Sequence, residues 1–123
     1  MSAAFFYDAV HFMAVAVEVV EVADCGIVGY CSTFENKRKP STLVLEGLGV
    51  SEKWRREGVG STLVRSSLAV AKKHNFATVE LVTAEENSAA RQLYAAHKFK
   101  EVELLTNYFG DGFDRLLMRR GVR

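Results

Sequence analysis

The stretch TLVLEGLGVSEKWRREGVGS, residues 42–61, decides the fold. Its apolar first part, residues 42–50, predicts a strand in the interior of a sheet that is covered on both faces. Gly47 and Gly49 inside that strand predict a bulge or a close approach by another backbone. After a polar segment, the apolar residues of segment 58–74 fall on one half of a helix at about 100° per residue. The stretch therefore predicts a strand followed by a surface helix that packs on a sheet.

The segments on either side complete a mixed sheet. Two strand-like segments before residue 42 flank the turn Asp24-Cys25-Gly26 and predict a β-hairpin. Strands are expected over residues 13–23, 26–35, 77–83, 100–106 and 113–119, and a second helix over residues 87–98. This order predicts an α/β fold with a mixed, largely antiparallel sheet flanked by helices and at least one right-handed crossover. Since no repeat or linker interrupts the pattern, we expect a single domain over residues 1–123.

The composition excludes several classes of function. The chain carries 16 Lys and Arg against 15 Asp and Glu, so no overall charge favours nucleic acid or an anionic membrane. Its most apolar run, residues 9–22, contains His11 and two glutamates and is too short to span a membrane. Cys25 and Cys31 are too few for a disulfide framework and match no zinc-site spacing. With no secretory signal pattern at its start, we expect a cytoplasmic protein without a metal site, and leave a nuclear location open.

The segment from Arg55 to Ser61 suits a ligand that contains a diphosphate. Glycines at a helix start let phosphate oxygens approach backbone N–H groups at the positive end of the helix dipole. The adjacent Arg55 and Arg56 can add charge-assisted hydrogen bonds. A P-loop is excluded because no Gly-Lys-Ser/Thr follows, and a dinucleotide fingerprint lacks its third glycine where Leu63 stands. Glycines that only ease helix packing remain the alternative.

Two motifs in the chain resemble those of the GNAT superfamily of N-acetyltransferases. Leu48-Gly49-Val50, followed by Arg55-x-x-Gly58-x-Gly60, is similar to the motif that binds the pyrophosphate of acetyl-CoA in that family. Asn87-x-x-Ala90-x-x-x-Tyr94, ending in Phe99, is similar to a second family motif. The resemblance covers residues 13–120 in the order of strands and helices, and implies a GNAT-like acyl-CoA N-acyltransferase fold. It also implies direct transfer of acetyl from acetyl-CoA, as co-substrate and without a metal, to a primary amine of a small molecule, a peptide N-terminus or a lysine.

The resemblance assigns a cofactor site residue by residue. The pantetheine arm would pair with the backbone of Leu48, Gly49 and Val50. The pyrophosphate would be held by Arg55, Arg56, Gly58, Val59, Gly60 and Ser61. Asn87 would hydrogen-bond the pantetheine, Tyr94 would lie close to the thioester sulfur, and the small Ala90 would leave room between them. Helical spacing places Asn87, Ala90 and Tyr94 on one face.

Tyr94 and Glu46 are the candidate catalytic residues. In direct transfer the amine must lose a proton, and the departing thiolate must gain one. Tyr94 can donate a proton to the sulfur, and a backbone N–H near Val50 can polarise the thioester carbonyl. Glu46 can act as general base, directly or through water, because partial burial in its strand would raise its pKa. The alternatives are a core aromatic for Tyr94 and a strand carboxylate paired with a cation for Glu46.

Other polar and aromatic residues have weaker assignments. His11, His74 and His97 are interpreted as structural or solvated, and the last two fall near helix C-termini, where an imidazolium is favoured. Tyr108 and Phe109 are similar to an aromatic pair that borders the peptide slot in family members that acetylate protein N-termini. Aromatics that pack back on the sheet are the alternative for this pair.

The sequence departs from the family at two places. Lys98 stands where the family usually has glycine, which should perturb the helix end. At the N-terminus about a dozen residues occupy the place of a strand and two helices that usually wall the acceptor site, so we expect an N-terminally shortened member that is compact, truncated or completed by a partner chain. The apolar run 3–10 suits a cap on the exposed sheet, a homodimer contact or a partner chain that completes the N-terminal side.

These departures leave two further functions open. One is a non-catalytic acyl-CoA-binding or regulatory subunit that lacks a complete acceptor site. The other is a protein-interaction module that uses the basic loop Lys37-Arg38-Lys39, for which a solvated loop is the simpler interpretation. Retention of both Asn87 and Tyr94 favours an active N-acetyltransferase, because binding of the nucleotide end alone needs neither residue.

Overall fold

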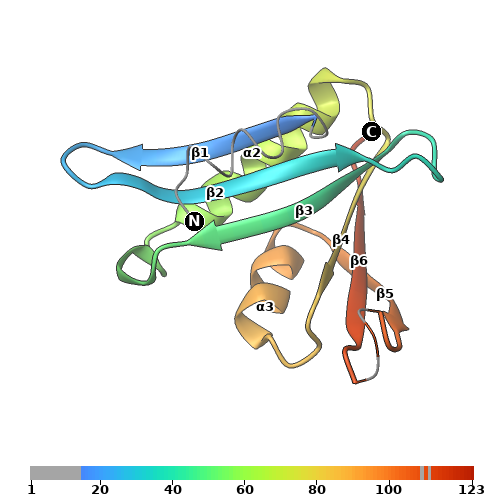
Figure 1. Ribbon diagram of the computed structural model, residues 1–123. Coiled ribbons are helices and arrows are strands. Elements are labelled where there is room, and N and C mark those ends of the chain that lie inside the picture. The colour runs from blue at the N-terminus through green and yellow to red at the C-terminus, as the bar shows by residue number, and fades with distance from the viewer. Residues whose placement is uncertain (1–14, 109, 111) are drawn as a thin grey trace.

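The described residues, 15–108, 110 and 112–123 of this computed structural model, form a six-stranded sheet with two α-helices. The strands lie in the order β1-β2-β3-β4-β6-β5 (Figure 1). Their bounds are β1 (Ala16–Val22), β2 (Gly26–Glu35), β3 (Thr42–Val50), β4 (Thr78–Thr83), β5 (Lys100–Leu105) and β6 (Arg115–Gly121). The helical segments are the 3-10 helix η1 (Glu52–Trp54) and the α-helices α2 (Val59–Lys73) and α3 (Ser88–Ala96).

The first two strands form the predicted hairpin. β1 and β2 pair antiparallel up to Val22 and Gly26, on either side of the turn. Asp24 and Gly26 adopt positive φ values of 68° and 77°, a conformation that glycine and short polar residues tolerate. The turn chemistry read from the sequence therefore matches the backbone that closes the hairpin.

Strand β3 has a different environment at each end. It pairs antiparallel with β2 from Leu43 to Val50, but it pairs parallel with β4 only over its first three residues. Beyond them the two strands diverge, as Figure 1 shows. The register with β2 shifts between Ser32 and Thr33, which leaves Glu46 as the extra residue of a β-bulge. The bulge predicted from the glycines of this strand is confirmed.

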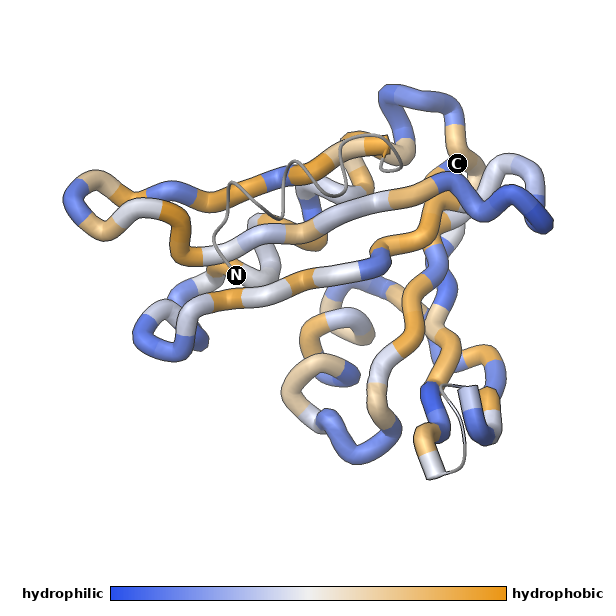
Figure 2. The backbone as a smooth tube through the Cα atoms, viewed as in Figure 1, coloured by the Kyte–Doolittle hydropathy of each residue, from blue (hydrophilic) through white to orange (hydrophobic). Residues whose placement is uncertain are grey.

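Helix α2 covers one face of β1, β2 and β3. Its apolar side is buried at Val59, Leu63, Val64, Val70 and Ala71. The helix approaches β2 closely, because a Cβ on Gly29 would lie only 2.6 Å from Val59 Cγ1. Figure 2 shows hydrophobic residues concentrated along the strands and hydrophilic residues in the loops that join them. The core therefore lies between α2 and the sheet, as the helical pattern predicts.

A buried carboxylate ties the β2–β3 loop to the sheet. Glu80 on β4 is 5% exposed, and its Oε1 lies 3.2 Å from Lys39 Nζ and 3.1 Å from Arg119 Nη2. Lys39 belongs to the basic loop that was expected to be solvated, whereas Arg119 belongs to β6. One of the three basic side chains of this loop therefore serves the fold.

The predicted α/β fold class is confirmed, with every expected strand and helix in order and bounds that move by at most three residues. Strands β3 and β4, joined through α2, form the parallel crossover. The apolar run 3–10 and His11 lie outside the described residues. Within the described part of the chain, neither helix has the length and apolar character needed to cross a membrane.

Candidate active site

The C-terminal half of β3 has an edge that is not paired with β4, and backbone groups point outward from this edge. Ser51 N donates to Val28 O at 2.8 Å, so Ser51 faces β2. Because residues in an antiparallel ladder alternate, Leu48 and Val50 direct their N–H and C=O groups to the opposite edge. Along the described chain, the one partner there is Arg55, whose Nε donates to Val50 O at 3.3 Å. Such an edge can pair with an extended, amide-bearing ligand as if that ligand were another strand.

The start of α2 forms an anion cradle that continues from this edge. Gly58 is the N-cap, with a left-handed φ of 84°, and Arg56 has a φ of 66°. The first helical hydrogen bond runs from Thr62 N to Gly58 O at 3.0 Å. The N–H groups of the first three residues of α2 therefore have no acceptor among the described residues. Free N–H groups at the positive end of a helix dipole suit a phosphate.

The cradle packs directly on α3. A Cβ on Gly60 would lie 3.2 Å from Leu93 Cδ2, so this glycine lets the two helices approach. Ser61 Oγ lies 3.1 Å from His97 Nε2 at the end of α3. Ser61, predicted to hold pyrophosphate, therefore already has a side-chain partner, while its backbone N–H remains free. These contacts join the cradle to the helix that carries Tyr94.

Asn87 is the N-cap of α3. Its Oδ1 accepts a hydrogen bond from Ala90 N at 3.1 Å, as an N-cap side chain does, and its carbonyl oxygen accepts one from Arg91 N at 3.0 Å. Its backbone therefore takes part in the first turn of the helix, while its side chain serves the cap. With the amide oxygen used by the cap, only the side-chain NH₂, which has no acceptor in the described part of the chain, is available to a pantetheine group. Ala90 packs at the edge of the core, next to this cap.

Tyr94 combines a buried ring with an accessible hydroxyl. The residue is 8% exposed, and its ring lies edge-on to Phe99 with centroids 5.8 Å apart. Burial, and secondarily the negative charge that Cys31 carries in its thiolate form, raises the pKa of Tyr94 to about 12. The hydroxyl has no partner among the described residues, and none of their fully buried side-chain oxygens is unpaired, so this oxygen reaches solvent. The phenol therefore keeps its proton at neutral pH and can offer it to a ligand.

Glu46 is exposed, so the predicted partial burial is wrong. The physical reason is its position: Glu46 is the extra residue of the β3 bulge, where β4 has already left the sheet edge. The alternative of a paired strand carboxylate is not supported either, because no cation among the described residues forms an ion pair with it. Glu46 is thus a solvated carboxylate beside the open half of β3.

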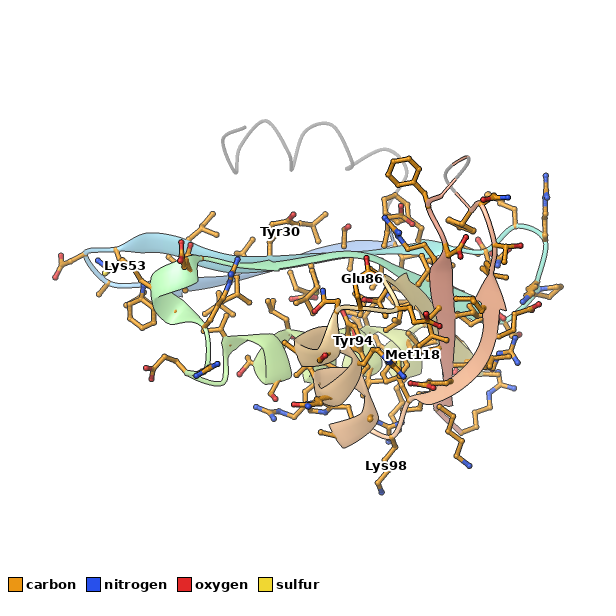
Figure 3. The ribbon with its side chains drawn as sticks, turned by 90° about the horizontal axis from the view of Figure 1, so that it is seen from below. Tyr30, Lys53, Glu86, Tyr94, Lys98 and Met118 are labelled. Carbon is orange, nitrogen blue, oxygen red and sulfur yellow. The ribbon has the colours of Figure 1, made fainter. Side chains whose placement is uncertain are left out.

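The ring of Tyr30 covers the glycines of β3 on the face away from α2. A Cβ on Gly49 would lie 2.6 Å from Tyr30 Cε1, and one on Gly47 would lie 3.7 Å from Tyr30 Cε2. The predicted close approach is therefore made by a side chain and not by a backbone. Figure 3 shows Tyr30 on the upper side of the strands and Tyr94 on α3 below them. Alternate glycines opposite an aromatic on a neighbouring strand are the sequence signal that could have identified Tyr30.

The loop between β5 and β6 presents an exposed aromatic. Tyr108 is 50% exposed, so half of the residue is accessible to a ligand. The loop is tied at its base, where Asn107 N donates to Asp114 Oδ1 at 2.8 Å. Phe109, the second member of the predicted aromatic pair, lies outside the described residues.

His97 links the two helices. Its Nε2 lies 3.1 Å from Ser61 Oγ, which agrees with its interpretation as a structural residue. Burial, followed by the charges of Arg65 and Arg120, lowers its pKa below the ordinary value. The contact with Ser61 was missed, because the sequence alone does not show that the start of α2 meets the end of α3.

Comparison with known proteins identifies the family of this chain. Residues 3–99 match the Acetyltransferase (GNAT) family. The chain is 36% identical to an N-alpha-acetyltransferase of Sulfurisphaera tokodaii, over 93% of this chain and 74% of that protein. It is 32% identical to an N-alpha-acetyltransferase of Saccharolobus solfataricus, over 82% of this chain and 66% of that protein.

A solved structure extends the likeness to three dimensions. The crystal structure of Ard1 from Thermoplasma volcanium superposes with a TM-score of 0.84 at 26% identity, covering 100% of this chain and 81% of that one. The matched family uses acetyl-CoA as its acetyl donor. The chain therefore belongs to the GNAT family of acetyltransferases, enzymes that transfer acetyl groups to amines.

Proposed function

We propose that this enzyme transfers acetyl from acetyl-CoA to the α-amino group at the N-terminus of a peptide or protein. The observation that carries the proposal is the continuous path from the open edge of β3, through the free N–H groups of α2, to the hydroxyl of Tyr94 on the adjoining helix. Relatives named N-alpha-acetyltransferase support an α-amine over a lysine or a small-molecule amine.

We assign each part of acetyl-CoA to polar groups of the protein that have hydrogen-bonding capacity to spare. Leu48 would pair with an amide of the pantetheine arm through the edge of β3, and Val50, whose carbonyl oxygen accepts from Arg55, would turn its N–H to the thioester end of that arm. The first residues of α2 would bind the pyrophosphate with their backbone N–H groups, because Val59 is buried and contributes only its backbone. Arg55 would remain between the two, since its guanidinium already contacts Val50 O and has further donors. The NH₂ of Asn87 would donate to a pantetheine carbonyl.

The chemical step needs two proton transfers and one polarised carbonyl. The amine nitrogen attacks the thioester carbon, a C–N bond forms and the C–S bond breaks. The N–H of Val50 would stabilise the oxyanion that develops on the carbonyl oxygen. Tyr94 would give its proton to the departing sulfur and regain one from solvent. Glu46 would accept the amine proton through water, which suits its exposed position on the bulge.

The acceptor would approach along the β5–β6 loop. Tyr108 stands there as an exposed aromatic on a loop whose base is tied by Asn107 and Asp114. An aromatic ring on such a loop can pack against an extended peptide while the peptide amine reaches the thioester. Phe109 is proposed as its neighbour in this role.

The non-catalytic alternative is not favoured, because the relatives are named N-alpha-acetyltransferase. We propose a cytoplasmic location on the basis of the thiols. Cys25 is exposed and Cys31 is buried, and neither is in a disulfide. Free thiols are typical of a reducing compartment.

The test is calorimetric titration with acetyl-CoA, followed in the same sample by thiol release on addition of peptides. The informative pair is one peptide with a free N-terminus and an internal lysine, and the same peptide acetylated at its N-terminus. We expect CoA release with the first peptide and none with the second. Release with both would move the activity to lysine, and release only with small amines would refute the peptide assignment.

A further inference from the structure

Three basic side chains meet beside the start of α2: Arg65 on α2, His97 after α3 and Arg120 on β6. His97 Nε2 lies 3.1 Å from Ser61 Oγ, and Arg120 Nη1 donates to the His97 carbonyl oxygen at 3.1 Å. Arg65 lies four residues after Ser61 on the same face of α2, and its Nη2 donates to Thr62 Oγ1 at 3.3 Å. We call these three residues the seam cluster.

The seam cluster has no carboxylate partner among the described residues. The ion pairs found there join other basic side chains to Glu80 and Glu101. Arg65 and Arg120 donate instead to a hydroxyl and a carbonyl, both neutral. Positive groups that converge without a counter-ion repel one another, so an anion bound among them would relieve that repulsion.

The electrostatics at His97 show the same imbalance. The charges that act on its ring are Arg65 from α2 and Arg120 from β6, and both lower its pKa in addition to the effect of burial. Ser61, the other contact of the ring, is neutral. A phosphate bound beside the ring would act in the opposite direction and raise the pKa of His97.

The seam cluster adjoins the proposed pyrophosphate cradle through one residue. The backbone N–H of Ser61 belongs to the free groups of the first turn of α2, while its hydroxyl contacts His97. In CoA, the ribose 3′-phosphate is only a few bonds from the pyrophosphate. A cofactor held by its pyrophosphate at the start of α2 therefore has a second phosphate within reach of the seam cluster.

We propose that Arg65, His97 and Arg120 form a subsite for the ribose 3′-phosphate of CoA and make the enzyme prefer acetyl-CoA to acetyl-3′-dephospho-CoA. Guanidinium groups suit this ligand, because their forked donors match the oxygens of a phosphate monoester. The inference rests on the proposed cofactor site and adds a contact that selects the nucleotide end.

The test compares the two cofactors by calorimetry on the full chain. We expect acetyl-CoA to bind about tenfold more tightly than acetyl-3′-dephospho-CoA, and this preference to fall to about twofold in Arg65→Gln. Arg120→Gln should reduce the preference similarly, and circular dichroism would verify that this strand variant folds. Lys72→Gln is the matched control, since it removes one exposed positive charge from the last turn of α2 and should keep the preference.

A second readout follows His97 itself by NMR titration of its ring protons. Acetyl-CoA should raise the pKa of His97, and acetyl-3′-dephospho-CoA should raise it less. Equal affinity of the wild-type protein for both cofactors, with equal shifts at His97, would overturn this inference and leave the proposed function intact. Absence of binding by either cofactor would overturn both.

Discussion

The two ends of β3 have the same strand geometry, but they differ in whether their backbone groups have partners within the chain. At its start, residues 42–44 are paired with β2 or β4, and the adjoining loop is locked by the buried carboxylate of Glu80. At its end, Leu48 and Val50 face an edge from which β4 has departed. The first end has its polar groups satisfied within the chain, whereas the second keeps groups for a ligand. A single strand thus anchors the fold at one end and forms the candidate site at the other.

This difference shows that divergence of two parallel strands leaves one edge of β3 without a partner strand. Buried backbone groups normally find partners inside the protein. Here the open half of β3 retains a ladder on its β2 side only, so its outward N–H and C=O groups have no strand partner, and among them only Val50 O has a partner in the described residues, the Arg55 side chain. Substitutions at the paired start of β3 and at its unpaired end should therefore have different effects, and each end can be tested separately.

The largest effect is expected from closing the open end with Val50→Pro. The Val50 N–H points away from β2, so proline removes the proposed oxyanion donor without breaking the β2–β3 ladder. We expect turnover to fall on the order of 10²–10³-fold in a folded protein, measured by steady-state thiol release. Gly49→Pro is the contrasting variant, because the Gly49 N–H faces β2 and its loss should break the β2–β3 ladder and destabilise the fold. Full activity of Val50→Pro would remove this N–H from the mechanism.

The next effect concerns the acid at the open end. Tyr94→Phe keeps the buried ring and its edge contact with Phe99, but it removes the proton donor. We expect turnover to fall about a hundredfold while the acetyl-CoA dissociation constant stays nearly unchanged. Because the pKa of Tyr94 is raised to about 12, its proton is retained below that value. Ionisation of Tyr94 should therefore not limit the wild-type rate between pH 7 and about 10. A wild-type rate that falls with an apparent pKa near 8, in a pH profile that Tyr94→Phe does not show, would contradict the raised pKa of Tyr94.

The closed end should affect stability and not chemistry. Glu80→Ala removes the carboxylate that holds Lys39 and Arg119, and we expect a loss of about 2 kcal/mol in the free energy of unfolding. Urea denaturation would measure this loss. Glu101→Ala is the control, since its ion pair with Arg91 is exposed and should contribute well under 1 kcal/mol. A fall in turnover of the folded Glu80→Ala protein, larger than for the control, would show that the two ends are not separate.

Much of the fold could be predicted from the sequence, because its signals are local. The valine-rich strands, the Asp24–Gly26 turn and the amphipathic pattern of α2 depend on neighbouring residues, and they were found within three residues of their bounds. The bulge at Glu46 was also signalled locally by the glycines around it. The divergence of β3 and β4 was not foreseen, since it depends on how the two halves of the sheet pack.

The candidate site was predicted less completely, and the misses share a cause. The family motifs located the cradle and Tyr94, but the exposure of Glu46 and the capping role of Asn87 depend on where strands and helices begin and end. The contact between Ser61 and His97 joins residues 36 positions apart. Contacts of that kind arise from tertiary packing, so spacing along the chain does not disclose them.

The smallest effect concerns α3, the helix beside the open end. Lys98 follows its C-cap with a left-handed φ of 68°, and Phe99 N donates to Tyr94 O at 3.0 Å, which together form a Schellman motif. Asn75 ends α2 in the same motif with a φ of 62°, but asparagine tolerates this conformation better than lysine. We therefore expect Lys98→Gly to stabilise the protein by about 0.5–1 kcal/mol in urea denaturation, and Asn75→Gly to give a smaller gain. Lys98 extends into solvent below α3 in Figure 3, so the substitution should leave turnover unchanged. Equal gains in the free energy of unfolding at the two positions would show that the backbone of Lys98 is no more strained than that of Asn75.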